Sequence, residues 1–437
     1  MKFCPECGVQ LVSQKFCHEC GANISKYLGG EPVNTNAQND SFNFGSLQVD
    51  AQKEYYKEVG FEVENGVLVK YIGKSSSVVI PRGISEIYSE AFKDNQTLVS
   101  VVVGEDVRII GKDAFLNCGH LKEVTLPENL LEIYEFAFMN CLELEKINIP
   151  SKIRAIRDRT FYYCRSLKEI NIPSSVKKIE RLAFDHCVFE KINIESIESW
   201  LNIEICNGSN PQGPLYLNGK LLTELIVPNG ITEIKDFGFW HISKLEKIVI
   251  PNSVTSIGNA AFGGCEDLKI VVLPNNLTII KKHGFSCCNS LQEIVIPASV
   301  QKIDEDVFWC CKNLKNVTLN EGITEIVPNT FGCCESIEYI NIPKSVKRIR
   351  KEAFFGCYNL KNITFNEGLE EIAGEAFSSS YKLEHITLPT SIRSVGGRAF
   401  AYSLKSVKLP KAFGEGKRRT ERGSYLSFSD SVQLIEY

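Results

Sequence analysis

A phenylalanine that recurs every 23 residues constrains the fold of this 437-residue chain more than any other feature. Eleven of the twelve intervals between successive copies are 23 residues, and the twelfth, from Phe184 to Phe239, is 55 residues, or two periods plus nine. The recurring residues are Phe92, Phe115, Phe138, Phe161, Phe184, Phe239, Phe262, Phe285, Phe308, Phe331, Phe354, Phe377 and Phe400. A fixed period of this length indicates one unit stacked many times, with an insertion after the fifth copy.

Each period carries the pattern of two short strands and a tight turn. Residues 121–126 alternate apolar and polar side chains as a half-buried strand does, and Pro127 ends that strand because it has no N–H to donate. A second apolar pair, Leu130 and Ile133, follows, and residues 137–141 read Ala-Phe-x-x-Cys. One such unit cannot bury its own apolar side, but a stack of units makes a continuous core.

The repeat resembles a known family once several copies are compared. The pattern Ile-Pro-x-Ser-Val-x-x-Ile-x-x-x-Ala-Phe-x-x-Cys appears almost unaltered at residues 149–164, 172–187, 250–265 and 342–357. It is similar to the bacterial surface-antigen-A (BspA) type of leucine-rich repeat, and the resemblance covers roughly residues 60–410. That resemblance implies a right-handed, β-rich leucine-rich-repeat solenoid and a role in adhesion or interaction, in proteins that are exported in many cases and intracellular in others.

Two copies of one cysteine motif stand at the start of the chain. Residues 2–8 and 15–21 differ only in having Pro5 in the first and His18 in the second. Four thiolates in two such turns form a tetrahedral soft site, which suits zinc first and iron second. The pattern resembles the short zinc ribbons of many bacterial proteins over residues 1–26. We therefore predict one structural Zn²⁺, whose ligands are Cys4, Cys7, Cys17 and Cys20.

The rest of the chain divides around the repeats. Residues 27–55 lack apolar periodicity and are predicted to be a flexible linker. The solenoid is expected over residues 56–410, with an insertion near 195–221, and residues 411–437 as a C-terminal cap or tail, so that the array stops near residue 410.

Two Asn-Gly pairs flanked by apolar residues predict β-hairpins. Asn65-Gly66 lies where the solenoid begins and indicates a hairpin that caps the array. Asn218-Gly219 lies in the insertion, after a turn-rich stretch.

Most of the remaining cysteines follow the repeat. Nine of them lie three residues after a recurring phenylalanine, where four other copies carry Asn95, Ile242, Ser380 and Ser403. A position that accepts such different side chains does not require sulfur chemistry, so we interpret these cysteines as compact inward residues.

Three cysteines stand apart, because Cys287, Cys310 and Cys333 lie two residues after the phenylalanine. Adjacent coils would place these thiols about 5 Å apart, which is compatible with disulfide formation. A redox role, a metal role and an accidental ladder all remain open for them. Free thiols at this density favour a reducing compartment, so the cytoplasm is the predicted location and the cell surface is the alternative.

Composition and motifs argue against several functions. The chain has 49 Lys and Arg against 53 Asp and Glu, which gives no basic surface for nucleic acid. No apolar run reaches the roughly 18 residues that a membrane-spanning helix needs. Phosphate-binding glycine loops, a nucleophile elbow and a His-Glu-x-x-His metal motif are all missing from the sequence, so no enzyme is expected.

The outward strand positions offer the best candidate for a binding surface. Apolar residues gather there after the insertion, and two further residues stand farther along the same face. The candidate partner-binding residues are Val249, Ile270, Val272, Val295, Tyr339 and His385. The simpler interpretation is an ordinary sheet face rich in β-forming residues.

These observations predict a non-catalytic protein-binding or scaffolding protein, with the zinc ribbon as a second docking site. One alternative is a nucleic-acid-associated protein in which the ribbon contacts nucleic acid while the solenoid recruits a partner. The other alternative is a cell-surface adhesin.

Overall fold

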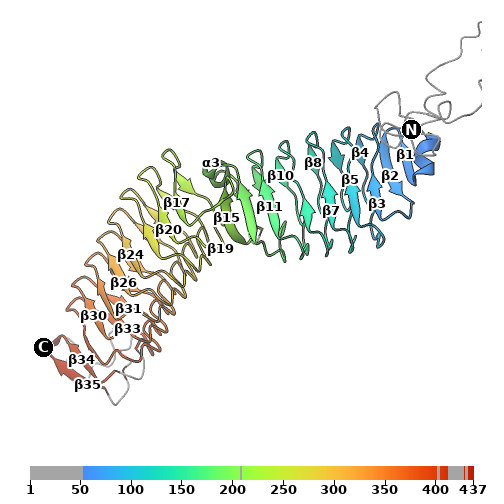
Figure 1. Cartoon of the computed structure of the whole chain (residues 1–437). Coiled ribbons are helices and arrows are strands. Elements are labelled where there is room, and N and C mark those ends of the chain that lie inside the picture. The colour runs from blue at the N-terminus through green and yellow to red at the C-terminus, as the bar shows by residue number, and fades with distance from the viewer. Residues whose placement is uncertain (1–52, 207–208, 401–403, 412–427, 429–431) are drawn as a thin grey trace, which may run out of the picture. The chain divides into compact units, whose positions relative to one another are not determined.

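The structure, a computed structural model, describes residues 53–206, 209–400, 404–411, 428 and 432–437. The described chain forms two compact units, which divide between Phe189 and Glu190 and are considered separately below. In each unit, short strands stack side by side along successive coils (Figure 1).

The first unit contains two rows of parallel strands, one pair of strands for each 23-residue coil. The first row comprises β3 (Ser77–Val79), β5 (Ser100–Val102), β7 (Glu123–Thr125), β9 (Lys146–Ile147) and β11 (Glu169–Ile172). The second row comprises β4 (Glu86–Ile87), β6 (Ile109–Ile110), β8 (Glu132–Ile133), β10 (Ala155–Ile156) and β12 (Lys178–Ile179). Paired residues are 23 positions apart, as in Val78 with Val101, so the sequence period is also the strand register.

The predicted opening hairpin is present. Strands β1 (Phe61–Glu64) and β2 (Val67–Tyr71) pair antiparallel around Asn65 and Gly66, whose φ angles are 50° and 78°. Both φ values are those of a type I′ turn, which Asn-Gly adopts readily. The hairpin joins the second row through β2 and β4, and the Tyr71 ring stacks 5.1 Å from the ring of Phe92.

The second unit repeats the two rows. Its first row comprises β17 (Glu224–Ile226), β20 (Lys247–Val249), β22 (Ile270–Val272), β24 (Glu293–Ile296), β26 (Asn316–Leu319), β28 (Tyr339–Ile342), β30 (Asn362–Phe365), β32 (His385–Thr387) and β34 (Ser406–Leu409). Its second row comprises β18 (Glu233–Ile234), β21 (Ser256–Ile257), β23 (Ile279–Ile280), β25 (Lys302–Ile303), β27 (Glu325–Ile326), β29 (Arg348–Ile349), β31 (Glu371–Ile372) and β33 (Ser394–Val395).

The insertion at the start of this unit is packed rather than open. It contains α3 (Ile197–Leu201), β14 (Glu204–Ile205), β15 (Gly213–Leu217) and β16 (Lys220–Leu221). Strand β15 pairs in parallel with β13 (Lys191–Ile194), which precedes the insertion, and with β19 (Ile242–Ser243), which belongs to a later coil. Strands β15 and β16 form the second predicted hairpin, around Asn218-Gly219. Trp200 of α3 is almost completely buried, and its indole Nε1 donates a hydrogen bond of 2.9 Å to the Gly238 carbonyl. A buried indole N–H needs a hydrogen-bond acceptor, and this bond fixes the position of α3.

The described part of residues 411–437, the expected C-terminal cap or tail, adds one more strand to the first row. Strand β35 (Gln433–Glu436) pairs in parallel with β34, and the Phe428 ring stacks 6.1 Å from the Phe400 ring. The register joins Ser406 to Gln433, an offset of 27 residues instead of 23. Because this segment departs from the period, a search by period cannot find it.

The recurring phenylalanines form the centre of the core. Within each unit, neighbouring rings in the column lie nearly parallel, with centroids 4.7 to 5.7 Å apart. The backbone fixes this spacing, since the N–H of one phenylalanine donates to a carbonyl of the next coil, as from Phe92 to Ala114 at 2.8 Å. Each ring therefore removes apolar surface from water and stacks on its two neighbours at the same time.

The cysteines that follow the phenylalanines are buried, as predicted, and they also donate hydrogen bonds. Each Sγ lies 3.1 to 3.3 Å from the phenylalanine carbonyl of the preceding coil, as in Cys141 with Phe115. That carbonyl already accepts a turn bond from the N–H of Cys118, so the thiol occupies its second lone pair. Ser380 makes the same bond to Phe354 through its hydroxyl, at 3.2 Å. The position thus selects a small donor rather than sulfur.

Burial favours the protonated form of the Cys118 and Cys141 thiols. It raises the pKa of Cys118 to about 12 and that of Cys141 well above its usual value. A thiol that stays protonated at neutral pH remains a hydrogen-bond donor, which the carbonyl requires.

We predict that removing one of these donors weakens the array more than exchanging it. Cys141→Ala deletes the donor and leaves a small void, and it should lower the free energy of unfolding by about 1 to 2 kcal/mol. Cys141→Ser keeps a donor and should lose less than half as much. Urea unfolding followed by circular dichroism measures both variants.

Ser380→Ala removes the equivalent donor in the second unit, where a hydroxyl makes the bond instead of a thiol. Equal stability losses for Cys141→Ala and Cys141→Ser would show that the donor contributes nothing.

Candidate protein-binding surface

The outward face of the first-row strands is the broadest regular surface of the second unit. Along each strand, side chains alternate between the core and the solvent, so that Ile248 is fully buried while Val249 on the same strand points outward and is half-buried. The in-register pairing of β17, β20 and β22 repeats this alternation from coil to coil. The chemistry of the outward face is therefore set by one or two residues per coil.

Five apolar side chains gather on this face, and we name them the apolar face. Its central row contains residues 23 positions apart, joined by strand pairing between β17, β20 and β22, while β24 contacts β22. The apolar face comprises Ile226, Val249, Ile270, Val272 and Val295. Ile226 is 64% exposed and Val295 is 53% exposed, so water covers much of these side chains.

Charged pairs border the apolar face. Lys247 Nζ lies 2.8 Å from the carboxylate of Glu224, in the row beside Ile226 and Val249. Exposed pairs such as this add little stability but keep the border hydrated. The result is an apolar centre with a polar edge.

Tyr339 and His385 lie on the same sheet face but outside the apolar face. They belong to the row of Ile270, three and five coils farther along, which at strand spacing corresponds to about 14 Å and about 24 Å. The Tyr339 hydroxyl lies 3.3 Å from Thr364 Oγ1, and His385 Nδ1 lies 2.8 Å from Ser406 Oγ. The structure thus brings four of the six predicted residues together, while these two are separate.

The sequence interpretation missed Ile226, although it lies one period before Val249 and the period would have found it. Exposed apolar residues also occur on the first unit's sheet face, where Val79 and Val102 pair in register and are 51% and 44% exposed. Val102 and Val79 occupy the same row as Thr125, one and two periods earlier.

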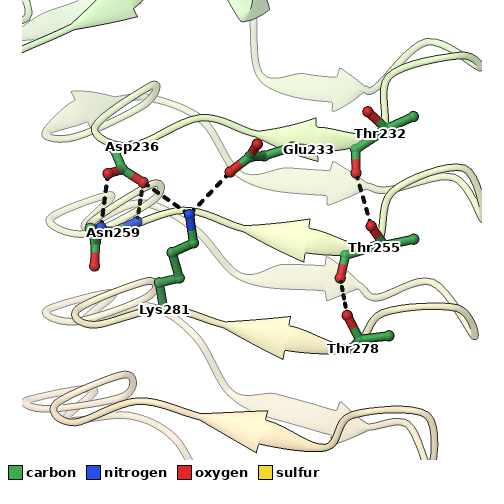
Figure 2. Close-up of polar contacts among 7 residues, drawn as sticks. All are labelled: Thr232, Glu233, Asp236, Thr255, Asn259, Thr278 and Lys281. Atoms are coloured by element: carbon green, nitrogen blue, oxygen red, sulfur yellow. Dashed lines mark hydrogen bonds and ion pairs between the residues drawn. The ribbon is translucent and has the colours of Figure 1, made fainter.

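Polar side chains flank the second-row strands of the same coils. Figure 2 shows Asp236 accepting hydrogen bonds of 2.8 Å from both the N–H and the side-chain amide of Asn259. Lys281 reaches across two coils to Glu233, at 3.1 Å, and lies 3.8 Å from Asp236. These polar side chains already have partners within the chain. The side chains of the apolar face carry no hydrogen-bonding group, so they can contact a ligand only through their apolar surface.

Threonines extend this polar row (Figure 2). Thr278 Oγ1 donates to the Thr255 carbonyl at 2.9 Å, and Thr255 Oγ1 lies 3.4 Å from the Thr232 carbonyl. The repeated bond ties each coil to the one before it, so we interpret the second row as structural.

A hollow of about 920 Å³ lies on the sheet face of the first unit. Its lining mixes both signs of charge, with Glu123, Lys146, Arg165 and Glu169 around Asn148. The hollow combines outward residues of three successive coils with turn residues, and a strand-by-strand inspection of the sequence does not reveal such a combination.

The predicted zinc ligands, Cys4, Cys7, Cys17 and Cys20, lie outside the described residues. Among the residues that the structure does describe, no group of three or more His, Cys, Asp or Glu side chains could hold a metal ion. Within the same residues, none of the helices has both the length and the apolar character needed to cross a membrane.

Comparison with protein-family models identifies the repeats. The model described as a BspA-type leucine-rich repeat region, six copies long, matches residues 74–205, 232–353 and 324–418, which together make up more than half of the chain. A search of curated proteins found no match.

Several solved structures are similar to this chain. A leucine-rich-repeat protein from Bacteroides ovatus is 23% identical, with a TM-score of 0.49, over 86% of this chain and 97% of the other. A leucine-rich cell surface protein from Faecalibacterium prausnitzii is 24% identical, with a TM-score of 0.41, over 70% and 92% of the two chains. The pneumococcal vaccine antigen PcpA is 16% identical, with a TM-score of 0.46, over 86% and 95%.

Proposed function

Because this chain belongs to the BspA-type leucine-rich-repeat family, we propose that it is a non-catalytic protein-binding or scaffolding protein whose apolar face contacts the partner. Leucine-rich-repeat proteins generally bind other proteins and are typically not enzymes. The observation that carries the proposal is a row of outward β-branched side chains, 23 residues apart on four neighbouring strands, of which Ile226, Val272 and Val295 are exposed.

The surface has the composition of a protein interface. An apolar centre bordered by charged residues is the usual arrangement in such interfaces, because the centre loses water on binding while the edge stays hydrated. The backbone groups of β20 are already paired with β17 and β22 on its two sides. Recognition therefore depends on side chains rather than on the addition of a strand.

Tyr339 and His385 extend the proposed contact. Both side chains are exposed on the row that contains Ile270, and both have polar groups at their tips. A partner long enough to follow the sheet face would meet the apolar face first and these two residues farther along. We assign them a secondary role for that reason.

We predict that a charge in the centre of the apolar face abolishes partner capture. Val272→Asp should weaken binding by about tenfold or more, because a carboxylate buried without a partner costs more than the roughly 1.4 kcal/mol that tenfold represents. The measurement compares proteins captured from cell lysate by the native chain and by the variant, with circular dichroism to confirm that both are folded.

Val102→Asp is the matched control, since Val102 is also an exposed, outward β-branched residue on a first-row strand but belongs to the first unit, outside the apolar face. The proposal requires that Val102→Asp retain the partners. If the double variant Ile226→Asp, Val272→Asp captures the same proteins as the native chain, the apolar face is not the binding surface.

We also propose that residues 1–26 form a zinc ribbon that serves as a second docking site. The support is the duplicated Cys-x-x-Cys sequence with a glycine after each pair, a spacing that suits four thiolates around one Zn²⁺. A segment this short cannot bury a core of its own, so metal binding would supply most of its folding free energy.

Metal analysis of the purified chain should give one equivalent of zinc, and Cys7→Ser with Cys20→Ser should remove it. Cys206→Ser, which changes a cysteine of the insertion, should retain the metal. Less than about half an equivalent of zinc or iron in the native chain would contradict a structural metal site, because such sites bind tightly.

A reducing compartment, the cytoplasm, is our proposal for the location. No disulfide joins the thirteen cysteines of the described residues, and nine of them donate hydrogen bonds that oxidation would abolish. We expect alkylation of intact cells to find these nine thiols reduced. Disulfides in the native protein from unstressed cells would instead favour the cell-surface alternative.

A further inference from the structure

Three consecutive coils of the second unit carry a second row of thiols outside the core. Cys287, Cys310 and Cys333 are spaced 23 residues apart, and all three are partly exposed. Their sequence neighbours Cys288, Cys311 and Cys334 are fully buried and bond to phenylalanine carbonyls. Solvent therefore reaches only the outer row.

The backbone at the outer row does not by itself select cysteine. The φ angles of Cys287, Cys310 and Cys333 are 57°, 59° and 57°, in the left-handed region that Asn, Asp and Gly tolerate best. Other coils place Asp94 and Asn117 at the same position, but also Tyr163, His186 and Ser379. What distinguishes these three coils is therefore the repetition of one thiol at one exposed position in adjacent coils.

This column brings side chains of adjacent coils into contact. In the first unit, Asn117 Nδ2 lies 2.7 Å from Asp94 Oδ1, and Asn140 Nδ2 lies 2.9 Å from Asn117 Oδ1. Beside the cysteines, a Cβ placed on Gly356, the next residue of the column, would lie 3.5 Å from Cys333 Sγ. Each side chain of the column thus leans over the following coil.

The coils that carry the three thiols are held at disulfide spacing. The ring centroids of Phe285 and Phe308 are 5.7 Å apart, and those of Phe308 and Phe331 are 5.5 Å apart. The backbone N–H of Cys310 donates to the Gly332 carbonyl of the next coil at 2.8 Å. A coil spacing of this size falls within the roughly 4.4 to 6.8 Å between Cα atoms that a disulfide spans.

We propose that Cys287, Cys310 and Cys333 form a thiol–disulfide exchange site, in which Cys310 forms a disulfide with either neighbour when a small-molecule disulfide is present. Cys287 and Cys333 are two coils apart, about 10 Å by strand spacing, and cannot pair directly. Cys310 is therefore required for either disulfide.

The exchange balances as two substitutions at sulfur. The thiolate of an outer cysteine attacks one sulfur of R–S–S–R, forms a mixed disulfide and releases RS⁻. The Cys310 thiolate then attacks the protein sulfur of the mixed disulfide and releases the second RS⁻. The two protons lost by the cysteines convert both leaving groups to RSH, so the chain loses two electrons and the small-molecule disulfide gains them.

The surroundings make this exchange slow at neutral pH. Burial raises the pKa of Cys287 and raises that of Cys310 to about 12, with Glu266 opposing ionisation of Cys287 and Lys312 favouring ionisation of both. The thiolate is the nucleophile. As long as the pH is below the pKa, the thiolate fraction increases about tenfold for each unit by which the pH is raised. The site should respond to sustained disulfide stress and respond faster as pH rises.

The test treats the full native chain with oxidised glutathione at pH 7 and at pH 9, alkylates the remaining thiols and maps the peptides by mass spectrometry. We expect a Cys287–Cys310 or Cys310–Cys333 linkage, the loss of two alkylatable thiols from the outer row, and faster loss at pH 9. The inner row, Cys288, Cys311 and Cys334, should remain reduced.

Two variants make the result specific. Cys310→Ser should leave no intrachain disulfide in the column, whereas Cys287→Ser should keep the Cys310–Cys333 linkage. Serine suits this position, because Ser379 occupies it in another coil at φ 63°. Cys206→Ser serves as the unrelated cysteine control and should behave as the native chain.

The proposal is overturned if all three outer thiols stay alkylatable while a cysteine peptide in the same tube is oxidised. It is also overturned if Cys310→Ser forms an intrachain disulfide in the column, or if the native linkages join different chains only.

Discussion

The hydrogen bond between the backbone of one coil and the backbone of the next is the constraint on which the rest of this structure depends. It fixes the separation of coils near the stacking distance of aromatic rings, so the bond from Phe92 N–H to the Ala114 carbonyl and the ring stacking of Phe92 on Phe115 reinforce each other. Because the bond recurs with a 23-residue offset, every side-chain position becomes a straight row along its unit. Side chains with the same role therefore lie in one row along each unit.

The rows are of three kinds, which have different roles. Inward rows hold phenylalanine and a small donor, Cys or Ser, and stabilise the stack. Outward strand rows tolerate almost any β-forming side chain, so a run of Ile and Val there is free to serve recognition. The left-handed turn row holds Asp, Asn, Tyr, His, Ser or Gly in other coils, and three adjacent coils carry cysteine there.

The sequence predicted whatever depends on the period or on local turn chemistry. The strand register follows from the spacing of Phe115 and Phe138, and both hairpins follow from Asn-Gly pairs that adopt positive φ. The donor role of Cys141 could not be predicted, since it requires the position of a carbonyl in another coil. Strand β35 could not be predicted because its offset departs from the 23-residue period. The hollow beside Lys146 could not be predicted because it combines residues from three coils.

The stagger between the two rows at the C-terminal end has a consequence for self-association. Parallel strands with an open edge invite a second copy to add its own strands, and a repeat array offers this at both rows together. In the described residues, β35 extends the first row beyond the second, which ends at β33. Among the described residues, a copy that paired with the outer edge of β35 would meet no second-row strand at the same level, so only one of the two rows would be extended by such a contact.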